Sequence, residues 1–202
     1  MKIKNAKFIT SVADYNKLPA LNAPEIAVAG KSNVGKSSFI NMLANINRLA
    51  KTSSTPGRTR LLNYFDINGG ELTLVDLPGY GFAKVNDSEK EKWSELIEGY
   101  FAKTPNLVNV FVLVDIRHEP TALDRQMVAY LHHYNIPFTL IATKGDKLSK
   151  AQIQKQKSVI AKTFAVTASN IYVTSALNKS GVTEVLERIE NILLANKETV
   201  EF

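Results

Sequence analysis

The amino-acid sequence predicts an α/β fold in which a mostly parallel sheet is covered by helices on both faces. Three observations support this prediction. Short apolar runs, typical of strands, alternate along the chain with longer segments that repeat apolar residues at helical spacing. The runs are apolar at successive positions, as strands buried on both faces are. The run at 26–29 also leads directly into a glycine-bearing loop and a helix, so its carboxyl end is a candidate ligand site.

The N-terminal part of the chain is expected to be an extension of the main domain. Residues 1–22 contain an alternating run at 7–12 and a short helical turn at 14–18. We therefore expect this extension to pack across a single domain formed by residues 23–198. The first helix of that domain is expected at 38–47, because its apolar residues share one face.

Two further strands follow a loop at 48–60 that is rich in hydroxyl and basic residues. The runs 61–67 and 71–76 are joined by Asn-Gly-Gly, so we expect an antiparallel hairpin. The other strands are expected at 108–114, 136–142 and 171–173, and the other helices at 88–103, 121–134, 149–164 and 181–195. With the strand at 26–29, these runs predict a mostly parallel six-stranded sheet with one antiparallel edge strand.

The loop after the first strand carries the most specific motif in the chain. Gly30, Gly35, Lys36 and Ser37 fit the pattern G-x-x-x-x-G-K-S between a strand and a helix. Glycines let successive backbone N–H groups approach phosphate oxygens, and the positive end of the following helix adds to that field. Lys36 would reach the outer phosphates, and the Ser37 hydroxyl is a suitable ligand for Mg²⁺. The motif predicts the three-layer fold of a P-loop NTPase.

A second motif, Asp76-Leu77-Pro78-Gly79, follows the strand at 71–76. Its carboxylate is placed to hold Mg²⁺ through the water shell of the metal, and the Gly79 N–H to approach a γ-phosphate. Hydroxyls of the 48–60 loop could complete the metal shell. Composition does not choose among Thr52, Ser53, Ser54, Thr55 and Thr59.

The segment Thr143-Lys144-Gly145-Asp146 follows another apolar strand and indicates guanine as the base. A carboxylate accepts two hydrogen bonds from guanine N1–H and its amino group, whereas adenine lacks that donor pair. Asp146 therefore favours GTP over ATP, and the aliphatic stem of Lys144 can lie against the flat ring. After the last strand, a backbone N–H is a candidate for guanine O6 within the segment Thr174, Ser175 and Ala176.

Composition bounds the remaining possibilities. A chain of 202 residues, 45% of them hydrophobic, can form one domain with a substantial core. Its formal net charge of +6 favours polyanionic partners such as RNA. The absence of cysteine excludes a disulfide framework and thiolate chemistry. No apolar run approaches the ~20 residues that span a bilayer, so we expect a soluble cytoplasmic protein without a membrane partner, monomeric by default.

The ordered set of motifs resembles that of the EngB/YsxC family of bacterial ribosome-biogenesis GTPases: G-K-S-N-V-G-K-S, T-P-G-R-T, D-L-P-G-Y-G-F-A-K-V, D-I-R-H-E-P, T-K-G-D and T-S-A-L. The resemblance implies a Ras-like G domain that binds GTP or GDP with Mg²⁺, with Thr59 as the metal ligand of its first switch. It implies nucleotide-sensing segments at 57–61 and 76–79. It also implies a partner, the large ribosomal subunit or its precursors, and a role in normal cell division and septation.

Two positions depart from general GTPase motifs. Thr143 replaces the usual asparagine of the base motif, so guanine selectivity depends more on Asp146. Tyr80 follows Gly79 where Ras-type enzymes carry the glutamine that orients water, which predicts slow intrinsic hydrolysis. In some related GTPases an asparagine at the position of Asn33 helps to hold K⁺ beside the phosphates. We therefore hypothesise that K⁺ stimulates hydrolysis.

These motifs define the predicted site. The catalytic groups are expected to be Lys36, Thr59, Gly79 and Asn33. The metal ligands are expected to be Ser37, Thr59 and, through water, Asp76. The nucleotide-binding residues are expected to be Gly30, Lys31, Ser32, Asn33, Val34, Gly35, Lys36, Ser37, Ser38, Gly57, Arg58, Thr59, Arg60, Leu61, Asp76, Leu77, Pro78, Gly79, Thr143, Lys144, Gly145, Asp146, Thr174, Ser175 and Ala176.

The sequence leaves alternatives open. Arg58, Arg60 and Lys84 either form a solvated charged surface or contact ribosomal RNA when GTP orders the switches. Beside a molecular switch that hydrolyses GTP, two other functions are compatible with the phosphate loop. One is a nucleotide-dependent scaffold for division proteins with negligible turnover, and the other is a P-loop phosphotransferase.

Overall fold

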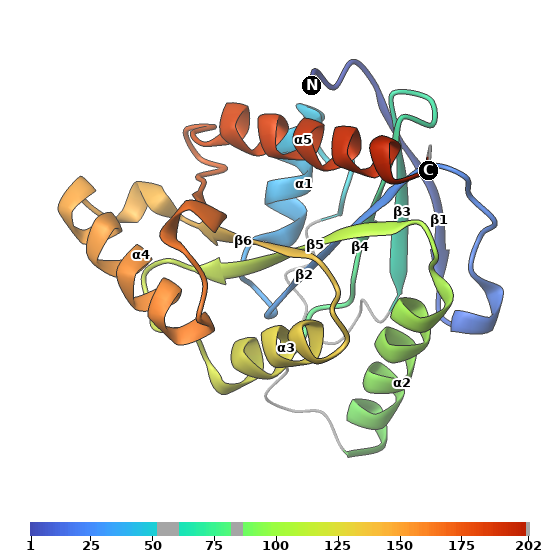
Figure 1. Cartoon of the computed structure of the whole chain (residues 1–202), viewed down its shortest axis with the longest axis horizontal. Helices are drawn as coiled ribbons and strands as arrows, with labels where there is room; N and C mark the ends of the chain where they lie inside the picture. Colours follow the sequence, from blue (N-terminus) through green and yellow to red (C-terminus); the bar gives the residue numbers. More distant parts are fainter. Residues whose placement is uncertain (52–60, 82–86, 201–202) are drawn as a thin grey trace.

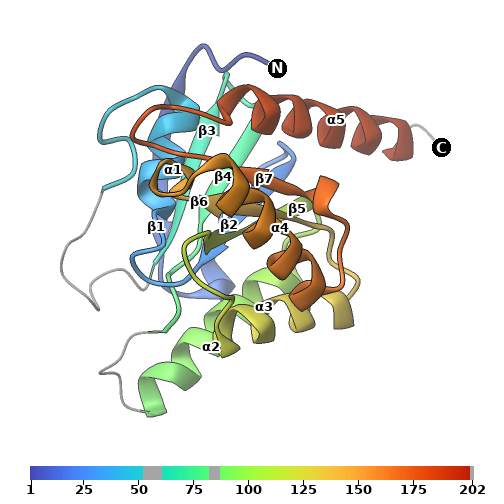
Figure 2. The same ribbon diagram turned by 90° about the vertical axis from the view of Figure 1, so that its left-hand side faces the viewer.

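A sheet of seven strands forms the centre of the molecule, in the order β1-β3-β4-β2-β5-β6-β7. The computed structural model describes residues 1–51, 61–81 and 87–200. Helices α1 and α5 lie on one face of the sheet, and α2, α3 and α4 lie on the other (Figure 1 and Figure 2). This arrangement confirms the predicted α/β fold with helices on both faces.

The elements follow the predicted order. The strands are β1 (Ala6–Val12), β2 (Glu25–Gly30), β3 (Leu62–Ile67), β4 (Leu72–Asp76), β5 (Leu107–Asp115), β6 (Phe138–Thr143) and β7 (Ile171–Val173). The α-helices are α1 (Lys36–Ala44), α2 (Asp87–Lys103), α3 (Ala122–His133), α4 (Lys150–Phe164) and α5 (Val182–Val200). Short 3-10 helices are η1 (Tyr15–Lys17), η2 (Gly145–Lys147) and η3 (Ala168–Asn170).

The pairing of the strands agrees with the predicted hairpin. Strand β3 is antiparallel to β4, with Asn63 opposite Asp76 and Ile67 opposite Leu72. Strand β2 is parallel to both β4 and β5, and β5, β6 and β7 continue the parallel part. All six residues of β2 are buried, as expected of a strand in the middle of a sheet covered on both faces.

The sheet is mostly parallel with antiparallel pairing at one edge, as predicted, and it has one strand more than the six expected. The alternating run in the N-terminal segment forms β1, which pairs antiparallel with β3 from Ala6 opposite Ile67 to Val12 opposite Leu62. The physical reason is that β3 would otherwise present a row of unpaired backbone groups at the edge, which a further strand satisfies. The ring of Phe8 also lies edge-on to Phe65, with centroids 5.9 Å apart.

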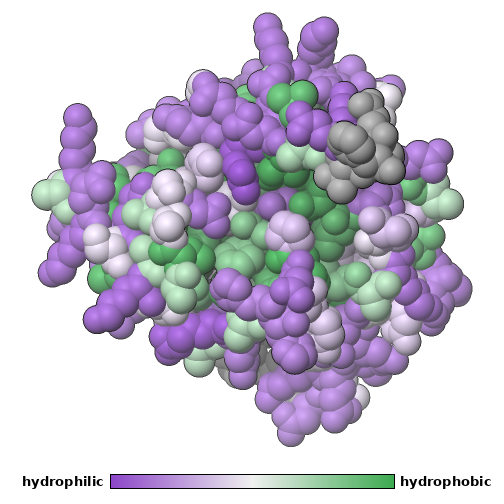
Figure 3. Space-filling view, viewed as in Figure 1, coloured by the Kyte–Doolittle hydropathy of each residue, from purple (hydrophilic) through white to green (hydrophobic). Residues whose placement is uncertain are grey.

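The core consists of two apolar layers, one on each face of the sheet. Leu96 and Tyr100 of α2 and Ile160 of α4 pack in one layer. Phe39 of α1 and Ile189 of α5 pack in the other. On the face shown in Figure 3, hydrophobic residues gather between α5 and α3, at the level of the sheet, and hydrophilic residues surround them. Within the described ranges, no helix is long and apolar enough to cross a membrane.

The carboxyl ends of the parallel strands meet at one edge of the sheet and lead into the loops that carry the motifs. Strand β2 leads into the phosphate loop, β4 into the segment 76–80, β6 into the base motif and β7 into the segment 174–177. Loops at this edge are where ligands bind in open α/β sheets. The fold therefore brings four separate motifs to one place.

Candidate nucleotide-binding site

The phosphate loop spans residues 30–36 between β2 and α1. A side chain at Gly30 would lie 2.8 Å from Val34 Cγ1, so there is no room for one. Gly35 caps α1 with a φ of 109°, in the left-handed region that favours glycine. The two glycines of the motif are thus required by packing at one end of the loop and by backbone conformation at the other.

Lys36 and Asp76 face each other at the floor of the phosphate loop. Lys36 Nζ lies 3.6 Å from Asp76 Oδ1, and the two side chains are only 13% and 8% exposed. Burial raises the pKa of Asp76, and the positive charge of Lys36 opposes that effect. Lys36 therefore lies where the sequence predicts contact with phosphate, and Asp76 lies where it predicts contact with the metal.

The residues at this point fit a Mg²⁺ ion. Within the part of the chain that the structure describes, Asp76 Oδ1 is buried and has no hydrogen-bond partner. A carboxylate oxygen with free acceptor capacity can receive a hydrogen bond from metal-bound water. Ser37 is the second residue of α1. No group of three His, Cys, Asp or Glu side chains among the described residues could hold a metal, so most other ligands would have to be phosphate oxygens and water.

The segment 76–80 lies directly against the phosphate loop. The Leu77 N–H donates to Val28 O over 3.0 Å, and the Ser32 N–H donates to Tyr80 O over 2.8 Å. A Cβ atom at Gly79 would lie 3.3 Å from both Lys36 Nζ and Ser32 Cα. One of the donors of the phosphate loop is therefore already bonded to this segment, and Gly79 comes closest to the lysine because it has no side chain.

Two aromatic side chains connect this segment to α2 and α3. The Tyr80 hydroxyl donates to Asp124 Oδ1 over 2.8 Å, and Trp93 Nε1 donates to Pro78 O over 3.0 Å. The two rings are 6.1 Å apart in an edge-on arrangement. They line a cavity of about 180 Å³ between α2 and α3. Sequence reasoning identified Tyr80 only as the residue that follows Gly79 in place of glutamine, and it did not find the Tyr80 contact with α3.

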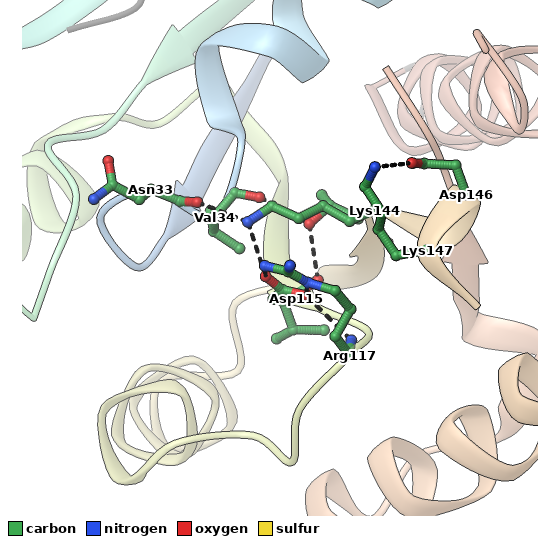
Figure 4. A network of polar contacts seen from close by, with 9 residues as sticks. Asn33, Val34, Asp115, Arg117, Lys144, Asp146 and Lys147 are labelled. Atoms are coloured by element: carbon green, nitrogen blue, oxygen red, sulfur yellow. Dashed lines mark hydrogen bonds and ion pairs between the residues drawn. The ribbon is translucent and has the colours of Figure 1, made fainter. Parts of the chain in front are cut away.

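The base motif is bound to the phosphate loop by two side chains (Figure 4). The Thr143 hydroxyl donates to Val34 O over 2.8 Å and lies 3.2 Å from Val114 O. Lys144 Nζ donates to Asn33 O over 3.0 Å, and the Asn33 side chain points away from this contact. Thr143, the residue that departs from the general motif, thus joins the base loop to the phosphate loop through its hydroxyl.

Asp115 forms the other half of this network. Lys144 Nζ lies 2.8 Å from Asp115 Oδ2, and Arg117 holds the same carboxylate with Nε at 2.9 Å from Oδ1 and Nη2 at 2.7 Å from Oδ2. Burial alone would raise the pKa of Asp115, but the hydrogen bonds from Arg117 and Lys144 outweigh it and hold that pKa well below its usual range. The carboxylate is therefore ionised and fixes the end of the Lys144 side chain.

Sequence reasoning did not find the contact between Asp115 and Lys144. The positions of the two residues in their strands could have revealed this contact. Asp115 ends β5, Thr143 ends β6, and the two residues are opposite each other in the parallel ladder. Side chains at matched ends of neighbouring parallel strands meet at the same edge of the sheet.

Asp146 is held in place by two neighbours. The Ser175 hydroxyl donates to Asp146 Oδ1 over 2.6 Å, and Lys147 Nζ lies 3.2 Å from Asp146 Oδ2. The hydrogen bond from Ser175 lowers the pKa of Asp146, and burial opposes it weakly. The side chain is thus an ionised acceptor, the form that can receive two hydrogen bonds from guanine.

The segment after β7 narrows the candidates for the guanine O6 contact. The Thr174 N–H donates to Ala142 O over 2.8 Å and the Ser175 N–H to Ser180 O over 3.1 Å. Among the residues that the structure describes, the Ala176 N–H has no hydrogen-bond partner. Ala176 is therefore the strongest candidate of the three, while Ser175 contributes its hydroxyl to Asp146 instead.

Some predicted residues cannot be placed. Gly57, Arg58, Thr59 and Arg60 lie outside the described residues, as does Lys84. Leu61 is half-buried immediately before β3. The described motifs nevertheless come together: the phosphate loop, the segment 76–80, the base motif and the segment 174–177 all lie at one edge of the sheet.

Comparisons with known proteins agree with this geometry. The family of 50S ribosome-binding GTPases matches residues 25–144. A probable GTP-binding protein EngB of Geobacter metallireducens is 47% identical over 201 residues, which cover 100% of this chain and 98% of that protein. A probable GTP-binding protein EngB of Clostridioides difficile is also 47% identical, over 192 residues that cover 95% of this chain and 94% of that protein.

Solved structures show the same fold at lower sequence identity. The crystal structure of a probable GTP-binding protein engB has a TM-score of 0.72 at 22% identity and covers 85% of this chain and 99% of that one. A structure of Era in complex with MgGDPNP and nucleotides 1506–1542 of 16S ribosomal RNA has a TM-score of 0.63 at 22% identity, covering 84% of this chain and 56% of that one.

Proposed function

Because the chain belongs to the EngB family of GTP-binding proteins, we propose that this GTPase acts as a molecular switch in the assembly of the large ribosomal subunit. One observation carries the switch part of the proposal: the segment 76–80 is hydrogen-bonded to the phosphate loop that receives the nucleotide. A phosphate in this loop would compete with Tyr80 O for the Ser32 N–H. The family description, ribosome binding, supports the choice of partner.

The reaction is transfer of the γ-phosphoryl group of GTP to water. Lys36 neutralises charge on the outer phosphates, and Asp146 and Lys144 bind the guanine base. Mg²⁺, when bound by Ser37 and through water by Asp76, would neutralise the phosphate charge further. Thr59 is the metal ligand proposed from the first switch. These residues position the substrate and stabilise charge, which is most of what phosphoryl transfer requires from a protein.

Slow intrinsic hydrolysis is part of the proposal. The Tyr80 side chain is only 5% exposed, and its hydroxyl donates to Asp124 on α3. A phenol in that position cannot orient a water molecule beside the γ-phosphate. Without a side chain that orients the attacking water, hydrolysis is slow until a partner supplies a group that does so. A docked ribosomal particle is the proposed source of the acceleration.

Stimulation by K⁺ is a separate proposal. Asn33 is exposed at the rim of the phosphate loop and has a φ of 64°. Its backbone oxygen accepts from Lys144, and its side chain points away from that bond. The side-chain oxygen is thus available for a monovalent cation beside the phosphates. Equal turnover in KCl and NaCl at matched ionic strength would contradict this proposal.

The switch follows from competition for the same groups. A γ-phosphate takes hydrogen bonds from the phosphate loop and Lys36, which now contact Tyr80 and Asp76. The displaced segment acts on α2 through Trp93 and on α3 through Tyr80. In the GTP form the switches, including Arg58, Arg60 and Lys84, would dock on ribosomal RNA, and hydrolysis would release the protein. Defects in cell division and septation would follow from failed assembly.

The decisive experiment compares single-turnover GTP hydrolysis with and without purified precursors of the large subunit. Acceleration by the particle, together with tighter binding in the GTP form than in the GDP form, supports the switch. Binding without acceleration would favour the nucleotide-dependent scaffold, and transfer of the phosphate to an added metabolite would favour a phosphotransferase. A Lys36→Ala variant, which loses the charge that binds the phosphates, is the control, and circular dichroism tests whether it keeps the fold without the ion pair to Asp76.

A further inference from the structure

The excess of basic over acidic residues coincides with one segment of the chain. Residues 147–183 contain six lysines and no aspartate, glutamate or arginine. The whole chain has 25 basic and 19 acidic residues, so outside this segment 19 basic residues balance 19 acidic ones. The formal net charge of +6 is therefore equal to the charge of this one segment. Two of these lysines have polar contacts elsewhere, Lys147 with Asp146 and Lys179 with Asn45.

Most of this charge lies on α4. The helix carries Lys150, Lys155, Lys157 and Lys162, which we call the α4 lysine surface. The first two and the last are exposed, and Lys157 is half-buried. The opposite side of the helix packs in the core through Ile160 and Phe164. Lysines seven residues apart, 150 with 157 and 155 with 162, form two rows in which the charges are about 10 Å apart.

Folding does not explain these lysines. Among the described residues, none of the four forms an ion pair, whereas Lys90 of α2 lies 2.8 Å from Asp87. The α4 helix has no acidic residue in its first turn, where Lys150 stands against the positive end of the helix dipole. None of the four is three or four residues from another, so mutual repulsion along the helix is weak. Their charge is not used by an ion pair within the described part of the chain, and it is available to a ligand outside the domain.

We propose that the α4 lysine surface binds the phosphate backbone of RNA. Its charge is complementary to a polyanion, and about one counterion is released for each phosphate that it contacts. The α4 surface lacks what a membrane contact needs, because the exposed large hydrophobic residues of the described chain lie elsewhere: Phe8, Ile9, Leu123, Tyr134, Leu177 and Leu194. A helix that lies in a bilayer interface buries an apolar face, and the outer positions of α4 are lysine, glutamine, alanine and serine.

None of the four lysines forms a hydrogen bond or ion pair with the segment 76–80 in the described part of the chain. Helix α4 packs on α3, η3 and the core, and the segment 76–80 contacts the phosphate loop, α2 and α3. Helix α3 is shared, but the lysines themselves lie outside the switch, so we expect RNA to bind α4 without GTP. The inference rests on the proposed function only for the natural source of the RNA, the large ribosomal subunit. The α4 lysine surface would supply an affinity for RNA that is the same with GTP and GDP. The switches would make the total affinity depend on the nucleotide.

The test replaces all four lysines by glutamine, K150Q/K155Q/K157Q/K162Q, which keeps helix propensity and removes the charge. The matched control, K2Q/K4Q/K7Q/K17Q, removes the same charge from four exposed lysines of the N-terminal segment. The probe is a fluorescein-labelled structured fragment of large-subunit ribosomal RNA, measured by anisotropy between about 50 and about 300 mM KCl. GTP affinity and circular dichroism are measured on both variants.

The α4 variant is expected to lose about tenfold or more in RNA affinity, and the slope of log affinity against log salt should fall by about 2 to 4. The control is expected to lose less than about threefold, and GTP affinity should not change in either. Equal losses in the two variants, or none in the α4 variant, would overturn the proposal. Lysine-dependent binding to phosphatidylserine vesicles without RNA binding would overturn it in favour of a membrane.

The outcome is distinguishable from that of the proposed function. If the α4 variant loses RNA affinity while ribosomal precursors leave hydrolysis unchanged, the RNA surface stands and the switch proposal falls. If precursors accelerate hydrolysis and the α4 variant binds RNA as tightly as the original chain, the switch stands and the RNA surface falls.

Discussion

The two halves of the nucleotide site are held together in different ways. The base half is joined by side chains that end in fixed contacts: Thr143 on Val34, Lys144 on Asn33 and Asp115, and Ser175 on Asp146. In the phosphate half, groups that would bind nucleotide contact the neighbouring segment instead: the Ser32 N–H donates to Tyr80 O, and Lys36 forms an ion pair with Asp76 over 3.6 Å. The base half is thus preorganised, and in the proposed switch the phosphate half would exchange partners when nucleotide binds.

This difference explains how one site can both select a nucleotide and report its state. Selection of guanine needs rigid acceptors, since a bond that is not made leaves a buried polar group unpaired. Sensing a γ-phosphate needs a segment with two arrangements of similar free energy, so that the ligand can shift the populations of the two arrangements. GTP and GDP share the base, and they differ only at the half that exchanges partners. The predictions below are ordered by their effect on nucleotide binding.

The largest effect is expected in the base half for Asp146→Asn. The amide cannot accept both guanine hydrogen bonds, so GTP affinity should fall by about 10³-fold or more. Xanthosine triphosphate should then bind better than GTP, because its carbonyl can accept from the new amide. Calorimetric titration with GTP and with xanthosine triphosphate measures this change in nucleotide preference. Glu187→Gln, at an exposed position of α5, is the control, and a loss of less than about threefold in GTP affinity would contradict the assignment of Asp146.

Asp115→Asn tests the network behind Lys144. Loss of the carboxylate charge frees the end of the Lys144 side chain, which now lies 2.8 Å from Asp115. We expect about a tenfold loss of affinity, equal for GTP and GDP, because the base half contacts both. Fluorescence titration with labelled guanine nucleotides measures it. Arg117→Gln leaves the Lys144 contact in place and should cost less. A loss of affinity for GTP but not for GDP would contradict the assignment of Asp115 to the base half of the site.

In the phosphate half, Tyr80→Phe removes the hydroxyl that donates to the buried carboxylate of Asp124. The free energy of unfolding should fall by about 1 to 2 kcal/mol. The ratio of GTP to GDP affinity should change by a few-fold, since the segment that competes with the γ-phosphate is held less firmly. Urea unfolding measures the first effect. Trp93, the single tryptophan, reports the second by its fluorescence, and an unchanged ratio would exclude Tyr80 from the switch.

The smallest effect on the nucleotide is expected from Glu25, at the opposite end of β2. Burial raises the pKa of Glu25 from 4.5 to about 7, although the hydrogen bond from Tyr100 opposes it. Because the folded-state pKa is the higher one, this group stabilises the fold most at low pH, and that contribution is lost as pH rises from 4.5 through 7.

Between pH of about 5 and about 8 the loss should be roughly 2 kcal/mol. Glu25→Gln should flatten that dependence in urea unfolding and leave GTP affinity unchanged. A pH dependence of the same size in Glu25→Gln would assign it to another group. A change in GTP affinity would show that the two ends of β2 are coupled, and the division of the site into two halves would then be incomplete.

Prediction from sequence succeeded where the deciding interactions are local. Gly30, Gly35 and the apolar run before them predicted a strand, a loop and a helix, because turn conformation and periodicity depend on neighbours in sequence. The Asn-Gly-Gly turn predicted the β3 and β4 hairpin for the same reason. The alternating run at 7–12 was recognised, but its place in the sheet was missed because β1 pairs with residues of β3 that are 50 to 61 positions away, and periodicity within a segment does not reveal its partner.

The sequence by itself determined the chemistry of the site: the glycine-bearing loop with its lysine, and the carboxylate of Asp146 after an apolar strand. Only the tertiary structure decided which groups hold these residues in position, such as Asp115 on Lys144 across 29 residues and Thr143 on Val34 across 109. The physical reason is that a motif follows from local backbone conformation and residue type. A contact between motifs depends on how strand ends align at the edge of the sheet, which packing and register determine.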